Sequence, residues 1–316
     1  MPLSPDEIRA LQAKAKELRC LMIDVTVWSG GAHIGGSLSA ADLLTALYYK
    51  YLRVRPEEPD WPDRDRFVLS KGHGGVGLAS VLADRGYFPK ELLHEFNHFK
   101  SPFGMHLDGA KVPGVDASTG SLGHGLSMAV GMALGARFQG KGWLTYCLLG
   151  DGECNEGSVW EAFMAAGHYR LDNLVFVIDY NKVQAKGFLS QDMGIEPIAD
   201  KLRAFQLDVH EIRNGHNVSE IIDLFTVLRQ QRRGKPIGIV LHTVKGKKVA
   251  ECQCNPNWHT SAPRNPDAAG AWLRELWEQD GRRLGIPKSF PDALHQAIRV
   301  LPPLHSNPDP VTDRQA

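Results

Sequence analysis

Residues 143–187 read WLTYCLLGDGECNEGSVWEAFMAAGHYRLDNLVFVIDYNKVQAKG. One apolar run, 144–149, ends at Gly150-Asp151-Gly152, and a second, 174–178, ends at Asp179-Tyr180-Asn181. A segment of helical character, from about 158 to 169, separates them. Two short apolar runs that flank one helix predict a β-α-β unit with parallel strands. We therefore expect an α/β fold, with a doubly wound, mostly parallel sheet and helices on both faces.

Polar groups follow both predicted strands at their carboxyl ends, where this architecture places its chemistry. Asp151 and Asn181 would face each other from strands about 4.8 Å apart. Their hard oxygen atoms suit Mg²⁺, which completes its octahedral shell with water and substrate phosphate. Gly150 and Gly152 let a bulky anion approach the backbone, and the following helix offers free N–H groups. The pattern predicts a site for Mg²⁺ and a diphosphate; for GDG alone, the alternative is a tight turn.

GDG with an asparagine thirty residues later resembles the thiamine diphosphate motif, and GDGECNEGSVWEA resembles its transketolase version. The resemblance implies the thiamine diphosphate-binding fold, with a diphosphate-binding (PP) domain over 1–302. It also implies that Asp151, the Asn181 amide oxygen and the Val183 carbonyl bind Mg²⁺, while Gly152 contacts the diphosphate. The proline-rich, polar segment 303–316 is expected to be a disordered tail.

Composition limits the classes of function. Lys and Arg number 36, and so do Asp and Glu, so no global field recruits nucleic acid or a membrane surface. The apolar stretch 128–136 is far shorter than the ~18 residues of a spanning helix, and the charged N-terminus lacks a signal core. Five cysteines form no disulfide framework, which favours the cytoplasm. A zinc site at Cys252, Cys254 and His259 is a weaker alternative, because the spacing is not standard and no fourth ligand is evident.

A histidine between four glycines follows an amphipathic helix predicted over 5–28. The loop, 29–36, resembles the transketolase SGHPG loop, with Ile34 in place of the proline. The resemblance implies that His33 reaches the reacting carbon; the alternative is a histidine in a surface turn. We expect the next helix to begin at Ser39, with Asp42 as its capping-box partner.

Two further histidines lie in similar settings. A strand predicted over 66–69 runs into Ser70-Lys71-Gly72-His73-Gly74, which resembles the family's S-x-GHG loop and places His73 beside the diphosphate. Lys71 is expected to be a solvated charge. The loop 99–120 resembles the GHPE…PGVE stretch, although Leu107-Asp108 replace Pro-Glu, and this implies that His106 lines the substrate channel.

The turn at 120–125, GSLGHG, resembles the family's GPLGQG turn, whose backbone packs against the cofactor. The resemblance therefore adds Gly120, Ser121 and Leu122 to the cofactor site. The helix predicted after it, 126–138, carries Gly131 and Gly135, which allow close helix contact in a core or at a subunit interface.

Glu156 and Glu161 follow the GDG motif. The helix dipole favours acidic residues in a first turn, and this alone accounts for them. The family match instead places them between two cofactor sites across a dimer interface, with Glu156 at the cofactor. Both interpretations remain open at this point.

The C-terminal third predicts strands at 208–212 and 236–244, and helices at 218–232, near 266–281 and at 289–300. Trp258-His259-Thr260-Ser261-Ala262-Pro263 resembles the WHG-x-AP stretch of two-subunit transketolases, which implies that His259 contacts both cofactor and substrate. Lys245 could approach the anion, whereas Lys247 and Lys248 read as a solvated run.

The resemblance spans residues 5–300, and the family's pyrimidine-binding domain would follow that region. It implies a second polypeptide, a C-terminal transketolase subunit, in an α2β2 assembly. The implied reaction transfers a two-carbon ketol unit from a ketose, expected to be phosphorylated, to an aldose. His33, His106 and His259 would bind donor hydroxyls and move protons. The alternatives are a transketolase-like subunit for a sulfonated or secondary-metabolite sugar, and a non-catalytic regulatory subunit.

Overall fold

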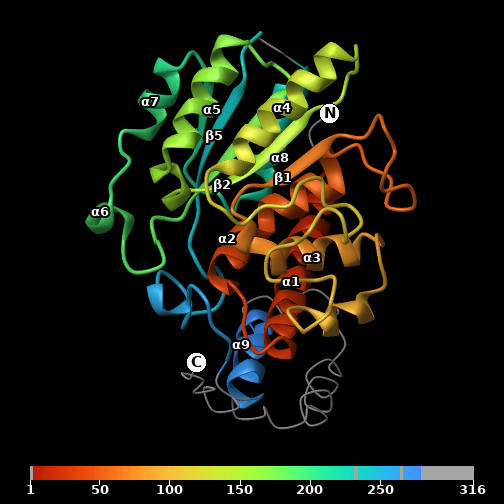
Figure 1. Ribbon diagram of the computed structural model, residues 1–316. Coiled ribbons are helices and arrows are strands. Elements are labelled where there is room, and N and C mark those ends of the chain that lie inside the picture. The colour runs from red at the N-terminus through yellow and green to blue at the C-terminus, as the bar shows by residue number, and fades with distance from the viewer. Residues whose placement is uncertain (1–2, 231–233, 264–265, 279–316) are drawn as a thin grey trace, which may run out of the picture.

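The computed structural model describes residues 3–230, 234–263 and 266–278 (Figure 1). Five strands alternate with helices along this part of the chain. The strands are β1 (Arg66–Leu69), β2 (Thr145–Gly150), β3 (Leu174–Tyr180), β4 (Asp208–Ile212) and β5 (Ile237–His242). The helices are α1 (Pro5–Trp28), α2 (Ile34–Ala46), α3 (Gly75–Asp84), α4 (His124–Phe138), α5 (Gly157–His168), α6 (Leu189–Asp192), α7 (Ile198–Ala204), α8 (Val218–Gln230) and α9 (Pro266–Glu278).

The strands form one parallel sheet in the order β1-β2-β3-β5-β4. Every residue of β2 and β3 is buried, which explains why these segments read as continuous apolar runs. Gly150 at the end of β2 pairs with Asp179 of β3, so the polar segments that follow these residues leave the sheet side by side. The predicted β-α-β unit is confirmed.

Helices cover both faces of the sheet, as predicted. Alternate strand residues point to opposite faces: Phe67 and Leu69 pack with α1, α2, α3 and α8, whereas Val68 packs with α4, α5 and α7. In Figure 1, α4 and α5 lie across one face of the strands, and α9 lies beside the lower end of α1. The doubly wound α/β fold is therefore confirmed.

Most predicted element boundaries agree with the structure to within a few residues. α1 begins with the capping box of Ser4 and Glu7, and α8 and α9 match the described parts of their predicted ranges. The helix predicted at 289–300, the domain end at 302 and the tail 303–316 lie outside the described residues. Across the described ranges, no helix combines the length and apolar character needed to cross a membrane.

The predicted start of the second helix is wrong. α2 begins at Ile34, with His33 as its N-cap residue. Ser39 donates instead to Gly36 O and to Asp179 Oδ2, at 3.0 and 2.6 Å. Asp42 forms an ion pair with Arg19. Partners from distant parts of the chain satisfy both side chains, so the local capping box does not form.

Candidate functional site

The loops after β1, β2, β3 and β5 enclose a cavity of about 260 Å³ at the carboxyl edge of the sheet. Ten of the twelve residues predicted for the site line it. They are His33, His73, His106, Gly120, Leu122, Asp151, Gly152, Asn181, Val183 and His259.

Ser121 and Glu156 do not line the cavity, and their contact with the cofactor stays a prediction. Both side chains are exposed, as is Glu161. In the turn, Gly123 has a φ of +85°, and a Cβ there would lie 2.4 Å from Ser158 Oγ and 2.8 Å from Glu156 Cβ. The turn is therefore packed against the start of α5, with the neighbouring Ser121 side chain on the surface.

The side chains of Asp151 and Asn181 are held by backbone groups. Asp151 Oδ1 accepts from Gly152 N at 2.8 Å and its Oδ2 accepts from Lys182 N. Asn181 Oδ1 accepts from Val183 N at 3.1 Å. Burial, followed by the negative charge of Asp179, raises the pKa of Asp151 to about 7. A bound cation would relieve the cost of ionising this carboxyl group.

Asp179 joins four segments around Asn181, and it was not among the predicted site residues. Its Oδ2 accepts from Lys71 Nζ at 2.6 Å, from Ser39 Oγ, and from Asn181 Nδ2 at 3.0 Å, while Oδ1 accepts from Thr243 Oγ1. The bond to Asn181 Nδ2 fixes which way that amide faces. The available signal was an acidic residue at the end of an otherwise apolar strand.

Lys71 is not a solvated charge, so that prediction is wrong. Its side chain is 1% exposed and donates to Gly36 O at 2.7 Å as well as to Asp179. Burial alone would raise the pKa of Asp179, but the Lys71 charge and the hydrogen bonds outweigh it and hold that pKa below the ordinary value.

Four imidazoles cluster on one side of the cavity. The ring centroid of His33 lies 5.0 Å from His259, 5.3 Å from His73 and 6.0 Å from His106. Backbone hydrogen bonds between Ala32 and Ser261 bring the segments of His33 and His259 together.

Three of these imidazoles have lowered pKa values. Burial, with smaller contributions from nearby cations, lowers the pKa of His33 and of His259 to about 4. Burial and Lys71 lower the pKa of His73 well below its ordinary value. These three rings are therefore neutral at physiological pH, and each offers one donor and one acceptor nitrogen.

Lys245 lines the cavity, and the sequence indicated only that it could approach the anion. Its Nζ donates to Val183 O and Gln184 O, both at 2.9 Å, and lies 3.0 Å from His259 Nδ1. Burial lowers the pKa of Lys245 to about 8, with Lys71 acting in the same direction and Asp151 opposing it. The amine therefore connects the predicted metal edge to the histidine cluster.

The cavity has the polar character that a diphosphate and a divalent cation require. His33 Nδ1 and Gln184 Nε2 line it and are buried, and neither has a hydrogen-bond partner within the described residues. A Cβ on Gly152 would lie 3.1 Å from Gln184 Cγ, so a side chain here would press on Gln184 and narrow this corner of the cavity. Together with the Asp151, Asn181 and Val183 oxygens, these groups fit the predicted ligand.

No metal cluster of the zinc type is present in the described part of the chain. There, no three His, Cys, Asp or Glu side chains are placed to hold an ion, and this includes the combination of Cys252, Cys254 and His259. Cys252 is buried and Cys254 is exposed. The alternative of a zinc site at these residues therefore has no support from the geometry.

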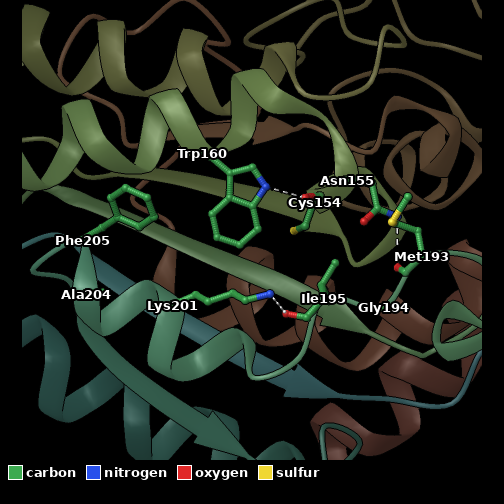
Figure 2. Close-up of a pocket in the computed structure, with 9 residues that line it drawn as sticks. All are labelled: Cys154, Asn155, Trp160, Met193, Gly194, Ile195, Lys201, Ala204 and Phe205. Carbon is green, nitrogen blue, oxygen red and sulfur yellow. Dashed lines mark hydrogen bonds between the residues drawn. The ribbon is translucent and has the colours of Figure 1, made fainter.

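A larger pocket, of about 530 Å³, lies between α5 and α7 (Figure 2). Trp160 and Lys201 face each other across it, and its polar groups bond to the surrounding backbone: Trp160 Nε1 donates to Cys154 O at 2.9 Å and Lys201 Nζ to Ile195 O at 3.0 Å. None of the predicted site residues lines it. We therefore place the chemistry in the smaller cavity.

The fold and the cavity define a thiamine diphosphate-binding α/β domain. A family model described as transketolase, thiamine diphosphate binding domain, matches residues 10–299, so the chain belongs to this family. It is 45% identical over 239 residues to a 6-deoxy-6-sulfo-D-fructose transketolase subunit of Clostridium sp. (strain MSTE9), with 75% of this chain and 86% of the relative covered. It is 38% identical over 278 residues to an apulose-4-phosphate transketolase subunit of Actinobacillus succinogenes, with 88% of this chain and 98% of the relative covered.

Solved transketolases share the fold. The enzyme of Leishmania mexicana superposes with a TM-score of 0.80 at 27% identity, over 95% of this chain and 45% of that one. The enzyme of Campylobacter jejuni superposes with a TM-score of 0.80 at 29% identity, over 92% of this chain and 46% of that one. The chain thus spans less than half the length of these solved transketolases.

Proposed function

We propose that the chain is the N-terminal, diphosphate-binding subunit of a two-subunit transketolase. It would transfer a two-carbon ketol unit from a ketose to an aldose, using thiamine diphosphate and Mg²⁺. The observation that carries the proposal is the convergence of Asp151, Asn181 and Val183 with four histidines on one cavity. The subunit names of the relatives support it.

The metal edge and the histidine cluster would have separate roles. Asp151, Asn181 Oδ1 and Val183 O would hold Mg²⁺, while Gly152 and His73 contact the diphosphate. Gly120 and Leu122 would contact the cofactor from the cavity wall. Ser121 and Glu156 would contribute to cofactor binding from outside that wall, through the turn and the subunit interface. When bound, thiamine diphosphate supplies the electron sink for breaking and forming the carbon–carbon bond.

His33, His106 and His259 would bind donor hydroxyls and move protons. The low pKa values of His33 and His259 keep their rings neutral, so His33 can accept a hydrogen bond from a hydroxyl at one nitrogen, whereas the acceptor nitrogen of His259 is taken by Lys245 and its other nitrogen donates. Lys245 lies 3.0 Å from His259 Nδ1, which leaves Nε2 as the nitrogen free to meet substrate.

The partner would be a C-terminal transketolase subunit that carries the pyrimidine-binding half, in an α2β2 assembly. Large apolar side chains that are exposed on α4 and α5 support a second copy of this chain as well: they are Met128 and Phe138 of α4 and Met164 of α5. Glu156, which precedes α5, and Glu161 within α5 are also exposed. Burying them between two copies would place them as the family match implies.

We extend the domain assignment to 1–302 as one diphosphate-binding unit, supported by the family match to 10–299. The five cysteines are all unpaired, which supports a cytoplasmic location. Nucleic acid and membrane are not proposed as partners, because the charges balance at 36 and 36.

The purified chain alone is expected to show no ketol transfer, because the residues that grip the pyrimidine ring would belong to the partner. Turnover should appear when the partner subunit is added. A panel of 6-phosphorylated and 6-sulfonated ketoses, assayed with the reconstituted complex, would identify the donor. Fast turnover by the chain alone, or no turnover with any ketose despite cofactor binding, would contradict the assignment; the second outcome would favour a regulatory subunit.

His33→Ala is expected to lower transfer by roughly 10²–10⁴-fold, the range of a general acid–base group, while cofactor affinity changes little. The reason is that His33 belongs to the histidine cluster and not to the metal edge. Steady-state rates and calorimetry on the complex measure the two effects. His94→Ala, on an exposed histidine outside the cavity, is the matched control. A wild-type rate for His33→Ala would remove this residue from the site.

A further inference from the structure

We infer that His216 is a positioning residue for the site, which acts by fixing the backbone amide of Val244, the residue before Lys245. His216 does not line the cavity and lies in the loop between β4 and α8. A continuous chain of contacts nevertheless runs from Arg19 through Asp42 and His216 to Val244. The inference deepens the proposed function and rests on it where the cofactor is concerned.

The first link is a buried ion pair between α1 and α2. Arg19 Nη1 donates to Asp42 Oδ1 at 3.2 Å, Nη2 donates to Asp42 Oδ2, and Nε donates to Leu38 O at 3.3 Å. Both charged side chains are less than 10% exposed. Burial would raise the pKa of Asp42, but the Arg19 charge and the bond to His216 outweigh it and lower that pKa to about 2. Asp42 is therefore a permanent acceptor.

The second link gives each nitrogen of His216 one role. His216 Nδ1 lies 2.7 Å from Asp42 Oδ2, and its Nε2 lies 2.8 Å from Val244 N. A backbone N–H can only donate and an ionised carboxylate can only accept. The ring must therefore be the neutral Nδ1–H tautomer, in which Nδ1 donates to Asp42 and Nε2 accepts from Val244.

The backbone around His216 is built for this approach. Gly215 N donates to His242 O at 2.8 Å, and a Cβ on Gly215 would lie only 2.7 Å from that same oxygen. β4 pairs with β5 only as far as Ile212 and Leu241, so the amide of Val244 lies beyond the reach of the sheet. Here the His216 imidazole accepts the hydrogen bond that a neighbouring strand would otherwise accept from Val244 N.

The third link reaches the cavity. Val244 precedes Lys245, whose stem runs along Gly35: a Cβ on Gly35 would lie 3.2 Å from Lys245 Cγ. Lys245 Nζ then meets Val183 O, Gln184 O and His259 Nδ1. Rotation of the peptide between Thr243 and Val244 would shift the Lys245 side chain that follows and move its amine away from all three. Because His216 accepts a hydrogen bond from the Val244 N–H of that peptide, it helps to set where the Lys245 amine lies.

The test compares two substitutions of His216 in the complex with its partner subunit. In His216→Leu both hydrogen bonds are lost, and Kd for thiamine diphosphate with Mg²⁺ is expected to rise by about 10–100-fold, the usual effect of removing a partner behind a ligand. In His216→Gln one amide can donate to Asp42 and accept from Val244, so most of the affinity should return. His210→Leu and His210→Gln, on a β4 histidine outside the cavity, are the controls.

If His216 had a merely structural role, His216→Leu would have a lower melting temperature, and His216→Gln would not restore the affinity for the cofactor. Wild-type affinity in a folded His216→Leu complex, or equal loss in the leucine and glutamine variants, would overturn the proposal. If His216→Leu does not fold, the tautomer of His216 is measured in the wild-type chain instead. Its ¹⁵N spectra should show Nδ1 protonated and Nε2 unprotonated. The opposite tautomer would overturn the proposal.

The spectrum requires no cofactor, so it separates this proposal from the proposed function. Failure of the wild-type complex to bind thiamine diphosphate would refute the function and leave the tautomer result standing. Conversely, the wrong tautomer in a complex that binds the cofactor would refute only the role of His216.

Discussion

Asp151→Ala should abolish Mg²⁺-dependent binding of thiamine diphosphate by the complex. Asp151 supplies the carboxylate of the predicted metal edge, and its neighbours there contribute only an amide oxygen and a carbonyl. Without it, the protein would offer only neutral dipoles to a divalent ion that favours charged oxygen ligands. Isothermal calorimetry with Mg²⁺ and thiamine diphosphate measures the loss.

Asp200→Ala is the matched control, because Asp200 is an exposed carboxylate of α7 outside the cavity. This variant should bind the cofactor as the wild type does. Unchanged affinity for Asp151→Ala would remove Asp151 from the metal site.

The same carboxyl group should leave a signature in stability without metal. Its folded-state pKa is raised to about 7 from 3.8, so the native state favours the protonated form. The wild type should lose stability relative to Asp151→Asn as pH rises from about 4 to about 7, and the difference should level off above that. Urea unfolding in the presence of a chelator, repeated across this pH range, measures the difference. A pH-independent difference would contradict the assigned pKa shift.

Asp179→Ala is expected to cost about 3–5 kcal/mol of unfolding free energy, because it leaves Lys71 as a buried charge without its carboxylate. Lys71 and Asp179 are each 1% exposed. Ser39, Thr243 and Asn181 also lose an acceptor. Since the bond to Asn181 Nδ2 fixes that amide, Mg²⁺ affinity should fall as well.

Asp63→Ala supplies the comparison, because its pair with Lys141 is 2.7 Å long but exposed. Solvent screens an exposed pair, so this variant should unfold at nearly the wild-type urea concentration. The double variant Lys71→Met with Asp179→Leu should regain much of the lost stability, since it removes both buried charges, yet it should not regain Mg²⁺ affinity. A buried ion pair that loses one partner is expected to cost several kcal/mol of unfolding free energy. If Asp179→Ala lowers the unfolding free energy by less than about 1 kcal/mol, Lys71 finds another partner.

The sequence predicted the fold well because its strands are buried on both faces. Such strands appear as short apolar runs with abrupt polar ends, and the runs before Asp151 and Asn181 are of this kind. Part of the site followed from the same property: parallel strands bring their carboxyl ends to one edge, so residues just past those ends converge. This reason covers His73, Asp151, Gly152 and Asn181, whereas His33, His106, Gly120, Leu122, Val183 and His259 were predicted from the family resemblance; all ten line the cavity.

The failures concern polar side chains whose partners are distant in sequence. Lys71 pairs with Asp179, which lies 108 positions away, and Asp42 meets His216 after 174 positions. Local rules treated Lys71 as solvated and Asp42 as a capping residue, because only tertiary packing decides which charges become buried. Ser121 was predicted from the turn motif alone; its side chain is exposed and does not line the cavity, so its contact with the cofactor stays a prediction.

A crystal of the complex grown with thiamine diphosphate and Mn²⁺ in place of Mg²⁺ tests the central claim most directly. The account predicts one anomalous peak within coordination distance of Asp151, Asn181 Oδ1 and Val183 O, with the diphosphate beside Gly152. A peak and a diphosphate bound far from the ends of β2 and β3 would contradict it.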